Sequence, residues 1–68
     1  MLIFGERLRE LRTERKLTAK QLAKHLNTTD ATVIRWENDT MSPKAEYIAE
    51  ISKFFNVSAD YLLGLKDY

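Results

Sequence analysis

The segment over residues 17–38, LTAKQLAKHLNTTDATVIRWEN, constrains the fold of this chain more than any other. Residues that share a helix face recur at helical spacing: Leu22, Ala23 and Leu26 form an apolar edge in the first half, and Val33, Trp36 and Glu37 lie on one face in the second. Asn27 lies between the halves, and Asn tolerates the left-handed conformation better than any residue except Gly. The segment therefore predicts two short helices joined by a tight turn at Asn27.

Such a pair is a helix-turn-helix, expected here over residues 19–38. The small side chain of Ala23 falls where the helices cross and permits their close approach. In this motif the second helix is suited to the major groove of DNA, with its first half at the base edges. Trp36 is expected in the core, rather than as a platform on which bases stack.

Two helices precede the turn in this interpretation. The first covers residues 3–15 and keeps its Arg- and Glu-rich side in solvent. Its apolar stripe is Phe4, Leu8 and Leu11. Thr18 and Gln21 form a capping box that starts the second helix, over residues 19–26.

Start and stop signals also define the helices after the turn. Thr28 or Thr29 caps a helix over 30–38, which ends with Asn38 or Asp39 at positive φ. Ser42-Pro43 predicts the start of a helix over 43–55, with Pro43 in its first turn. The expected inner face of that helix is Ala45, Ile48, Ile51, Ser52 and Phe55. Ser58 and Gly64 bound a last helix over 59–63, and the tail 65–68 is expected to fray.

The whole pattern predicts an all-α, compact five-helix bundle, because strand alternation is absent. With 68 residues the chain is expected to form a single domain, residues 1–68. There is no Cys, and His25 is the only His, so disulfides, Cys nucleophiles and His/Cys metal clusters are not expected. No enzyme, metal or cofactor is therefore predicted. No membrane span or signal peptide is predicted either, and a cysteine-free chain fits the cytoplasm.

Charge is distributed unevenly along the chain. Residues 1–26 hold seven Lys/Arg and three Asp/Glu, whereas residues 27–68 hold four and seven. A basic part and an acidic part favour one face toward a polyanion and another away from it. Solvated helix faces are the alternative interpretation.

Five segments together give a more specific identification: FGERLRELR, LTAKQLA, VIRWEN, SP and FFNVSADYLLG. They resemble the Cro and phage-repressor helix-turn-helix family, also called the xenobiotic-response-element type, over residues 4–64. The resemblance implies five helices, sequence-specific binding of duplex DNA, and a dimer on a near-palindromic operator. It also implies that Arg12 pairs with Glu37 and lies near a phosphate, which ties the recognition helix to the first helix.

The chain departs from the family pattern at three positions and in one loop. Ala19 stands where Gln is common, and Asn27 and Asp39 stand where Gly is favoured. The loop over 39–41 is not basic. These departures predict modest affinity from phosphate neutralisation and a shallow dependence on salt.

The candidates for reading bases lie on the second helix of the motif. They are Thr29, Asp30, Ala31, Thr32 and Arg35. Arg35 suits guanine O6 and N7, or else a phosphate or solvent, and Ala31 and Thr32 suit a thymine methyl or plain helix surface. Asp30 could accept from cytosine N4, although stabilising the helix start is favoured. For Ile34 a methyl contact and a protein contact both stay open.

The candidates for phosphate contact are Arg12, Thr18, Lys20, Asn38, Thr40 and Lys44. Surplus apolar surface at the C-terminal end predicts a homodimer interface of Phe54, Val57, Tyr61 and Leu65, with Tyr68 nearby. The leading hypothesis is thus a bacterial or phage-encoded regulator, in the form of a dimeric repressor. The alternative is an antitoxin-type or protein-interaction module with weak DNA binding and a protein partner.

Overall fold

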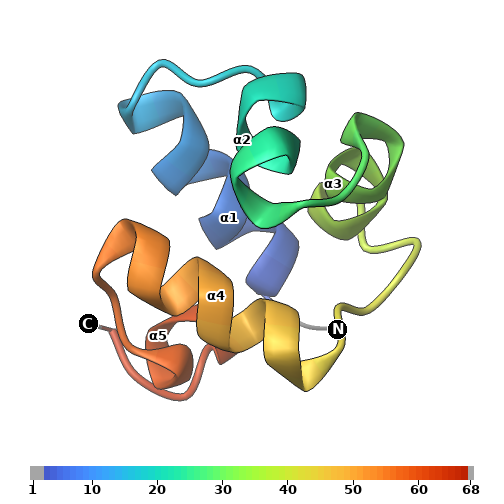
Figure 1. Ribbon diagram of the computed structural model, residues 1–68. Coiled ribbons are helices and arrows are strands. Elements are labelled where there is room, and N and C mark those ends of the chain that lie inside the picture. Colours follow the sequence, from blue (N-terminus) through green and yellow to red (C-terminus); the bar gives the residue numbers. More distant parts are fainter. Residues whose placement is uncertain (1–2, 68) are drawn as a thin grey trace.

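The computed structural model describes residues 3–67, and within that range it consists of five helices without strands (Figure 1). They are α1 (Phe4–Glu14), α2 (Ala19–Leu26), α3 (Asp30–Glu37), α4 (Ala45–Phe55) and α5 (Ala59–Leu63). The all-α, five-helix prediction is confirmed. Among the described residues no helix has the length and apolar character needed to cross a membrane. The same residues contain no group of three His, Cys, Asp or Glu side chains placed to hold a metal ion.

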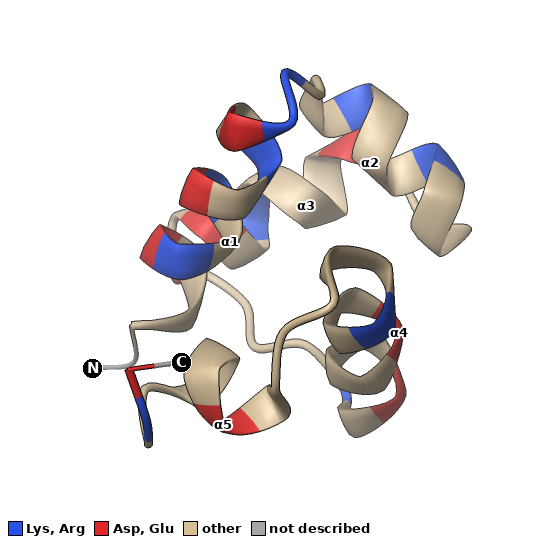
Figure 2. Ribbon diagram, turned by 90° about the vertical axis from the view of Figure 1, so that its left-hand side faces the viewer, with Lys and Arg blue, Asp and Glu red and all other residues tan. Residues whose placement is uncertain are grey.

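The helices form two groups around one core. In both ribbon views α1, α2 and α3 lie together above α4 and α5 (Figures 1 and 2). Every helix contributes to the core, which is Phe4, Leu8, Leu22, Ala23, Leu26, Val33, Trp36, Ile51, Phe55 and Leu62. Trp36 is 1% exposed, as predicted, and its ring packs 5.0 Å from that of Tyr47.

The predicted turn and caps around α2 and α3 are confirmed. The hydroxyl of Thr18 accepts from the Gln21 amide while the Gln21 side chain accepts from the Thr18 amide, so the capping box is complete. Asn27 adopts the left-handed conformation at φ 58°. Thr29 caps α3 by accepting from the Thr32 amide. Asp39, at φ 61°, is the residue that takes the positive φ after α3.

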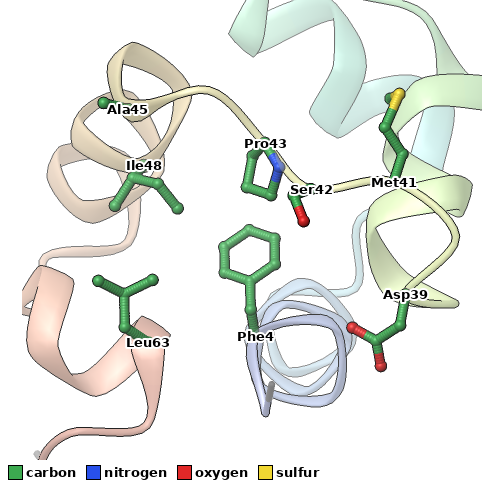
Figure 3. A pocket seen from close by; sticks show the side chains of 8 residues that line it. All are labelled: Phe4, Asp39, Met41, Ser42, Pro43, Ala45, Ile48 and Leu63. Atoms are coloured by element: carbon green, nitrogen blue, oxygen red, sulfur yellow. The ribbon is translucent and has the colours of Figure 1, made fainter. Parts of the chain in front are cut away.

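The predicted start of α4 is wrong. The helix begins at Ala45 with Lys44 as its N-cap, so Ser42 does not cap it and Pro43 precedes it outside any helix. Lys44 has an extended backbone, with φ −70° and ψ 159°, which prevents the helix from reaching back to Pro43. Pro43 and Phe4 instead line the same apolar hollow of about 390 Å³ (Figure 3). Ala45 is exposed because it opens the helix rather than joining its inner face.

The first helix and the tail also differ from expectation at their ends. Helix α1 starts at Phe4 rather than Ile3 and stops at Glu14, and α3 stops at Glu37. The described part of the tail makes contacts with the rest of the chain: Arg7 donates to the Lys66 carbonyl at 2.7 Å and lies 4.2 Å from the Tyr61 ring. The Leu65 amide also donates to the Asp60 carbonyl at 2.8 Å. Tyr68 lies outside the described residues.

Candidate nucleic-acid interface

Helix α3 is buried on one side and open on the other. Its inner positions Val33, Trp36 and Glu37 are buried, and helices α1 and α2 pack against it. Its outer positions Asp30, Ala31, Ile34 and Arg35 are exposed, as is Asn38 directly after the helix. The side chains of this outer face therefore point away from the protein, at positions where they could meet another molecule.

A glycine of α1 brings that helix into backbone contact with α3. A Cβ added to Gly5 would lie 2.5 Å from the carbonyl oxygen of Glu37 and 2.6 Å from that of Trp36. Only a residue without a side chain fits there, because backbone atoms cannot move aside as a flexible side chain can. The C-terminal end of α3 is thereby fixed directly against the start of α1.

An ion pair strengthens the same junction, as the resemblance implied. Arg12 donates from Nε to Glu37 Oε2 at 2.6 Å and from Nη2 to Glu37 Oε1 at 3.0 Å, while its Nη1 donates to the Leu17 carbonyl at 2.8 Å. The side chains of Arg12 and Glu37 are 17% and 4% exposed. The hydrogen bonds that Arg12 donates to Glu37 raise the pKa of Arg12, so the guanidinium stays charged. Because desolvation offsets much of such an attraction, the pair mainly orients the two helices.

Arg9 is a member of this network that sequence reasoning missed. Its Nη2 donates to Asn38 Oδ1 at 2.9 Å, and its Nε lies 3.6 Å from Glu37 Oε1. The side chain is 52% exposed. Its position three residues before Arg12 was the available signal, since residues so spaced share a helix face. Glu37 thus faces two arginines, and this junction keeps an excess of positive charge.

Three of the base-reading candidates use their side chains in hydrogen bonds within the first turn of α3. The Thr29 and Thr32 hydroxyls lie 2.9 Å apart, and Asp30 Oδ1 accepts from the Ala31 amide at 2.8 Å. The Asp30 contact supports its role at the helix start, where a carboxylate also opposes the positive end of the helix dipole. Thr29, Asp30, Ala31 and Arg35 are exposed, whereas Thr32 is half-buried.

The phosphate candidates lie at different places around α3. Lys20 shares a hollow of about 440 Å³ with Thr29 and Asp30, which puts it beside the first turn of α3. The Thr40 hydroxyl donates to the Arg35 carbonyl at 3.2 Å, and Asn38 is held by Arg9. Thr18 uses its hydroxyl in the capping box, and Arg12 is largely enclosed. Lys44 is exposed at the N-cap of α4.

The helices differ in the charged residues that they carry. Figure 2 shows only basic colour on α2, from Lys20 and Lys24, and only acidic colour on α5, from Asp60. Helices α1 and α4 carry both colours (Figure 2). The basic helix α2 packs against α3.

The residues predicted to pair two subunits are only partly exposed. Phe54 packs 4.9 Å from the His25 and Phe55 rings, and Tyr61 lies beneath Arg7. Val57 is half-buried, and Leu65 is 71% exposed. Apolar surface that the sequence assigned to a partner is thus used in part within this chain.

Comparison with known proteins relates this geometry to a family. The profile of a family described as helix-turn-helix matches residues 8–62. The chain is 42% identical over 61 residues to the HTH-type transcriptional activator BcrR of Enterococcus faecalis, an alignment that covers 90% of this chain and 30% of BcrR. It is 37% identical over 61 residues to the HTH-type transcriptional regulator ImmR of Bacillus subtilis, which covers 90% of this chain and 48% of ImmR. The chain thus spans less than half the length of either relative.

A solved structure has the same fold. The crystal structure of the P22 c2 repressor protein in complex with a synthetic operator, 9T, superposes with a TM-score of 0.86 at 30% sequence identity. The superposition covers 93% of this chain and 96% of that one.

Proposed function

This chain belongs to the helix-turn-helix family, and we therefore propose that it is a transcriptional regulator. It would bind double-stranded DNA in a sequence-specific manner. The observation that carries the proposal is the open outer face of α3, with Ala31 and Arg35 exposed while Val33 and Trp36 anchor the helix from behind. The likeness to a repressor solved with its operator supports this use of the helix. Helix α3 would lie in the major groove.

Each exposed group has a role suited to its chemistry. Arg35 would donate two hydrogen bonds to guanine O6 and N7, and Ala31 would contact a thymine methyl. Lys20 and Lys44 would bind phosphates on either side of α3, together with Thr18, Asn38 and Thr40. Arg12 would act mainly by orienting α3, because most of its donors are already bound within the protein.

The regulator is proposed to act as a homodimer that represses transcription by occupying a near-palindromic operator. Phe54, Val57, Tyr61 and Leu65 are the proposed contact residues, with Leu65 the most exposed of them. A two-fold pair would set two copies of α3 about 34 Å apart, one turn of DNA. Sedimentation at several protein concentrations tests the dimer separately from DNA binding.

Selection from a pool of duplexes tests the main proposal. At about physiological salt, we expect recovery of one near-palindromic sequence bound with a Kd of about 10⁻⁸–10⁻¹¹ M. Arg35→Ala should relax base preference at a single position, whereas Lys44→Ala should weaken all sequences alike and lower the salt slope by about 1. Lys53→Ala, an exposed lysine of α4, is the matched control and should change neither quantity.

The opposite outcome would support the protein-interaction alternative. Weak binding that is blind to sequence would mean that α3 does not read bases. Asp30 and Asp39 favour that alternative, because both carboxylates would face a phosphate backbone. A preference that survives Arg35→Ala unchanged would contradict the role of Arg35 alone.

A further inference from the structure

We propose that Ile34 is a specificity-determining residue that reads the C5-methyl group of a pyrimidine in the major groove. The inference rests on the proposed function, and it adds a chemical preference at one position of the operator. Thymine carries this methyl group in ordinary DNA, and 5-methylcytosine carries it in modified DNA.

The first observation is where Ile34 lies. It is 46% exposed, and only two other large apolar residues of the described chain are comparably open, Met41 and Leu65. Those two lie in the loop after α3 and in the tail, whereas Ile34 is in the middle of the recognition helix. It shares the outer face with Ala31, three residues before it, and Asn38, four residues after it.

The second observation is the character of its surroundings. Along α3, Ile34 is flanked by the polar Asp30, Arg35 and Asn38, and the apolar Ala31 adds only a methyl group, so Ile34 is the one large apolar side chain of this face. A surface that binds a protein through hydrophobic contact needs a continuous apolar patch, and these neighbours interrupt one. A single apolar group suits a ligand that offers a single apolar group among hydrogen-bonding ones.

The floor of the major groove is such a ligand. Each base pair presents donors and acceptors there, and the C5-methyl of thymine is its only apolar group. An isoleucine cannot make a hydrogen bond, so burial against a methyl is the one favourable base contact open to it. At any other base, the Ile34 side chain would cover polar base atoms, and these atoms would lose water without gaining a hydrogen-bond partner.

Helix geometry predicts which base pair of the operator carries the methyl group that Ile34 contacts. Residues three apart on an α-helix are separated by about 4.5 Å along its axis, and base pairs by about 3.4 Å. Ala31 and Ile34 would therefore address neighbouring base pairs. Arg35 follows Ile34 directly, so the methyl should lie within one base pair of the guanine that Arg35 contacts.

Methyl deletion in the DNA tests the inference directly. The probe is the selected operator, in which each thymine in turn is replaced by deoxyuridine, which lacks only the methyl. At one position per half-site, distinct from any position that Ala31 contacts, we expect wild-type protein to lose about fourfold in affinity, equivalent to about 0.8 kcal/mol. Ile34→Ala should bind the thymine and uracil forms equally there.

Two further measurements show whether the effect depends on the methyl group alone and on Ile34 in particular. At the same position, a 5-methylcytosine·guanine pair should bind wild-type protein about fourfold better than cytosine·guanine, which shows whether the methyl alone is read. Met41→Ala removes a comparably exposed apolar side chain outside the helix and should keep the full thymine preference. Circular dichroism should show both variants folded, since both side chains are at the surface.

The inference is overturned if wild-type protein is indifferent to the methyl at every position, or if Ile34→Ala retains the full preference. Either result leaves the proposed function standing, because the operator has already been selected and bound. Failure to select any operator would overturn both.

Discussion

Replacing Gly5 by Ala should destabilise the protein even though Ala is the better helix former. The new Cβ would lie 2.5 Å from the Glu37 carbonyl oxygen and 2.9 Å from its carbonyl carbon. To reach the 3.4 Å at which ordinary contact begins, the two backbones must separate by about 0.9 Å. That displacement acts on the segment of α3 that carries buried Trp36 and the Glu37 side chain bound to Arg12.

The magnitude follows from two opposing effects. Overpacking of a well-packed contact costs about 1–3 kcal/mol, and the upper end applies here because the atoms in the way are backbone. Higher helix propensity returns at most about 1 kcal/mol, since Gly5 is in the first turn of α1. The net loss is about 2 kcal/mol, from a domain of this length expected to have about 3–10 kcal/mol in all.

Urea unfolding followed by Trp36 fluorescence measures this loss, because that ring is buried in the folded state. We expect a lower midpoint with an unchanged m value, and a melting temperature lower by roughly 8–16 °C. Glu10→Ala is the matched control, an exposed position of the same helix where the change should stay within about 0.5 kcal/mol. If Gly5→Ala is as stable as wild type or more so, the close approach of α1 to α3 is refuted.

Three further substitutions test other parts of the structure. Arg12→Ala leaves the enclosed Glu37 carboxylate without its main partner and should cost about 3 kcal/mol in urea unfolding, whereas a loss below 1 kcal/mol would mean that water reaches Glu37 readily. Thr29→Ala removes the cap of α3 and should cost about 1 kcal/mol by the same assay, with Thr29→Ser as the conservative control that restores it. Lys16→Gly should raise stability by about 1 kcal/mol, because Lys16 is exposed at φ 58°, and a loss of stability would contradict the positive φ.

Features set by neighbouring residues in the chain could be predicted from the sequence. The capping box of Thr18 and Gln21 depends on residues three apart, and the left-handed turn at Asn27 depends on the residue itself. Helical spacing then separated the buried face of α3 from its open one. The five helices and the helix-turn-helix followed from such local signals, and the resemblance added the pair between Arg12 and Glu37.

Features set by distant residues could not be predicted. Pro43 carries the local signal of a helix start, but it lines a hollow together with Phe4 from the other end of the chain, and α4 starts only after the extended Lys44. Arg7 and Arg9 belong to a charged stretch assigned to solvent, yet one holds residue 66 and the other holds residue 38. Nothing in the sequence near Gly5 indicates which carbonyl groups it will meet.

The backbone contact at Gly5 would also affect how the protein discriminates between DNA sequences. With no side chain at Gly5 to separate α1 from the end of α3, and with Glu37 bound by Arg12 of α1, the recognition helix cannot tilt without moving α1. A duplex whose groove does not match must then deform to accommodate the protein. Base steps that no side chain touches would thereby influence affinity through their stiffness, and flexible steps such as TA would be favoured wherever the docked helix requires a bend.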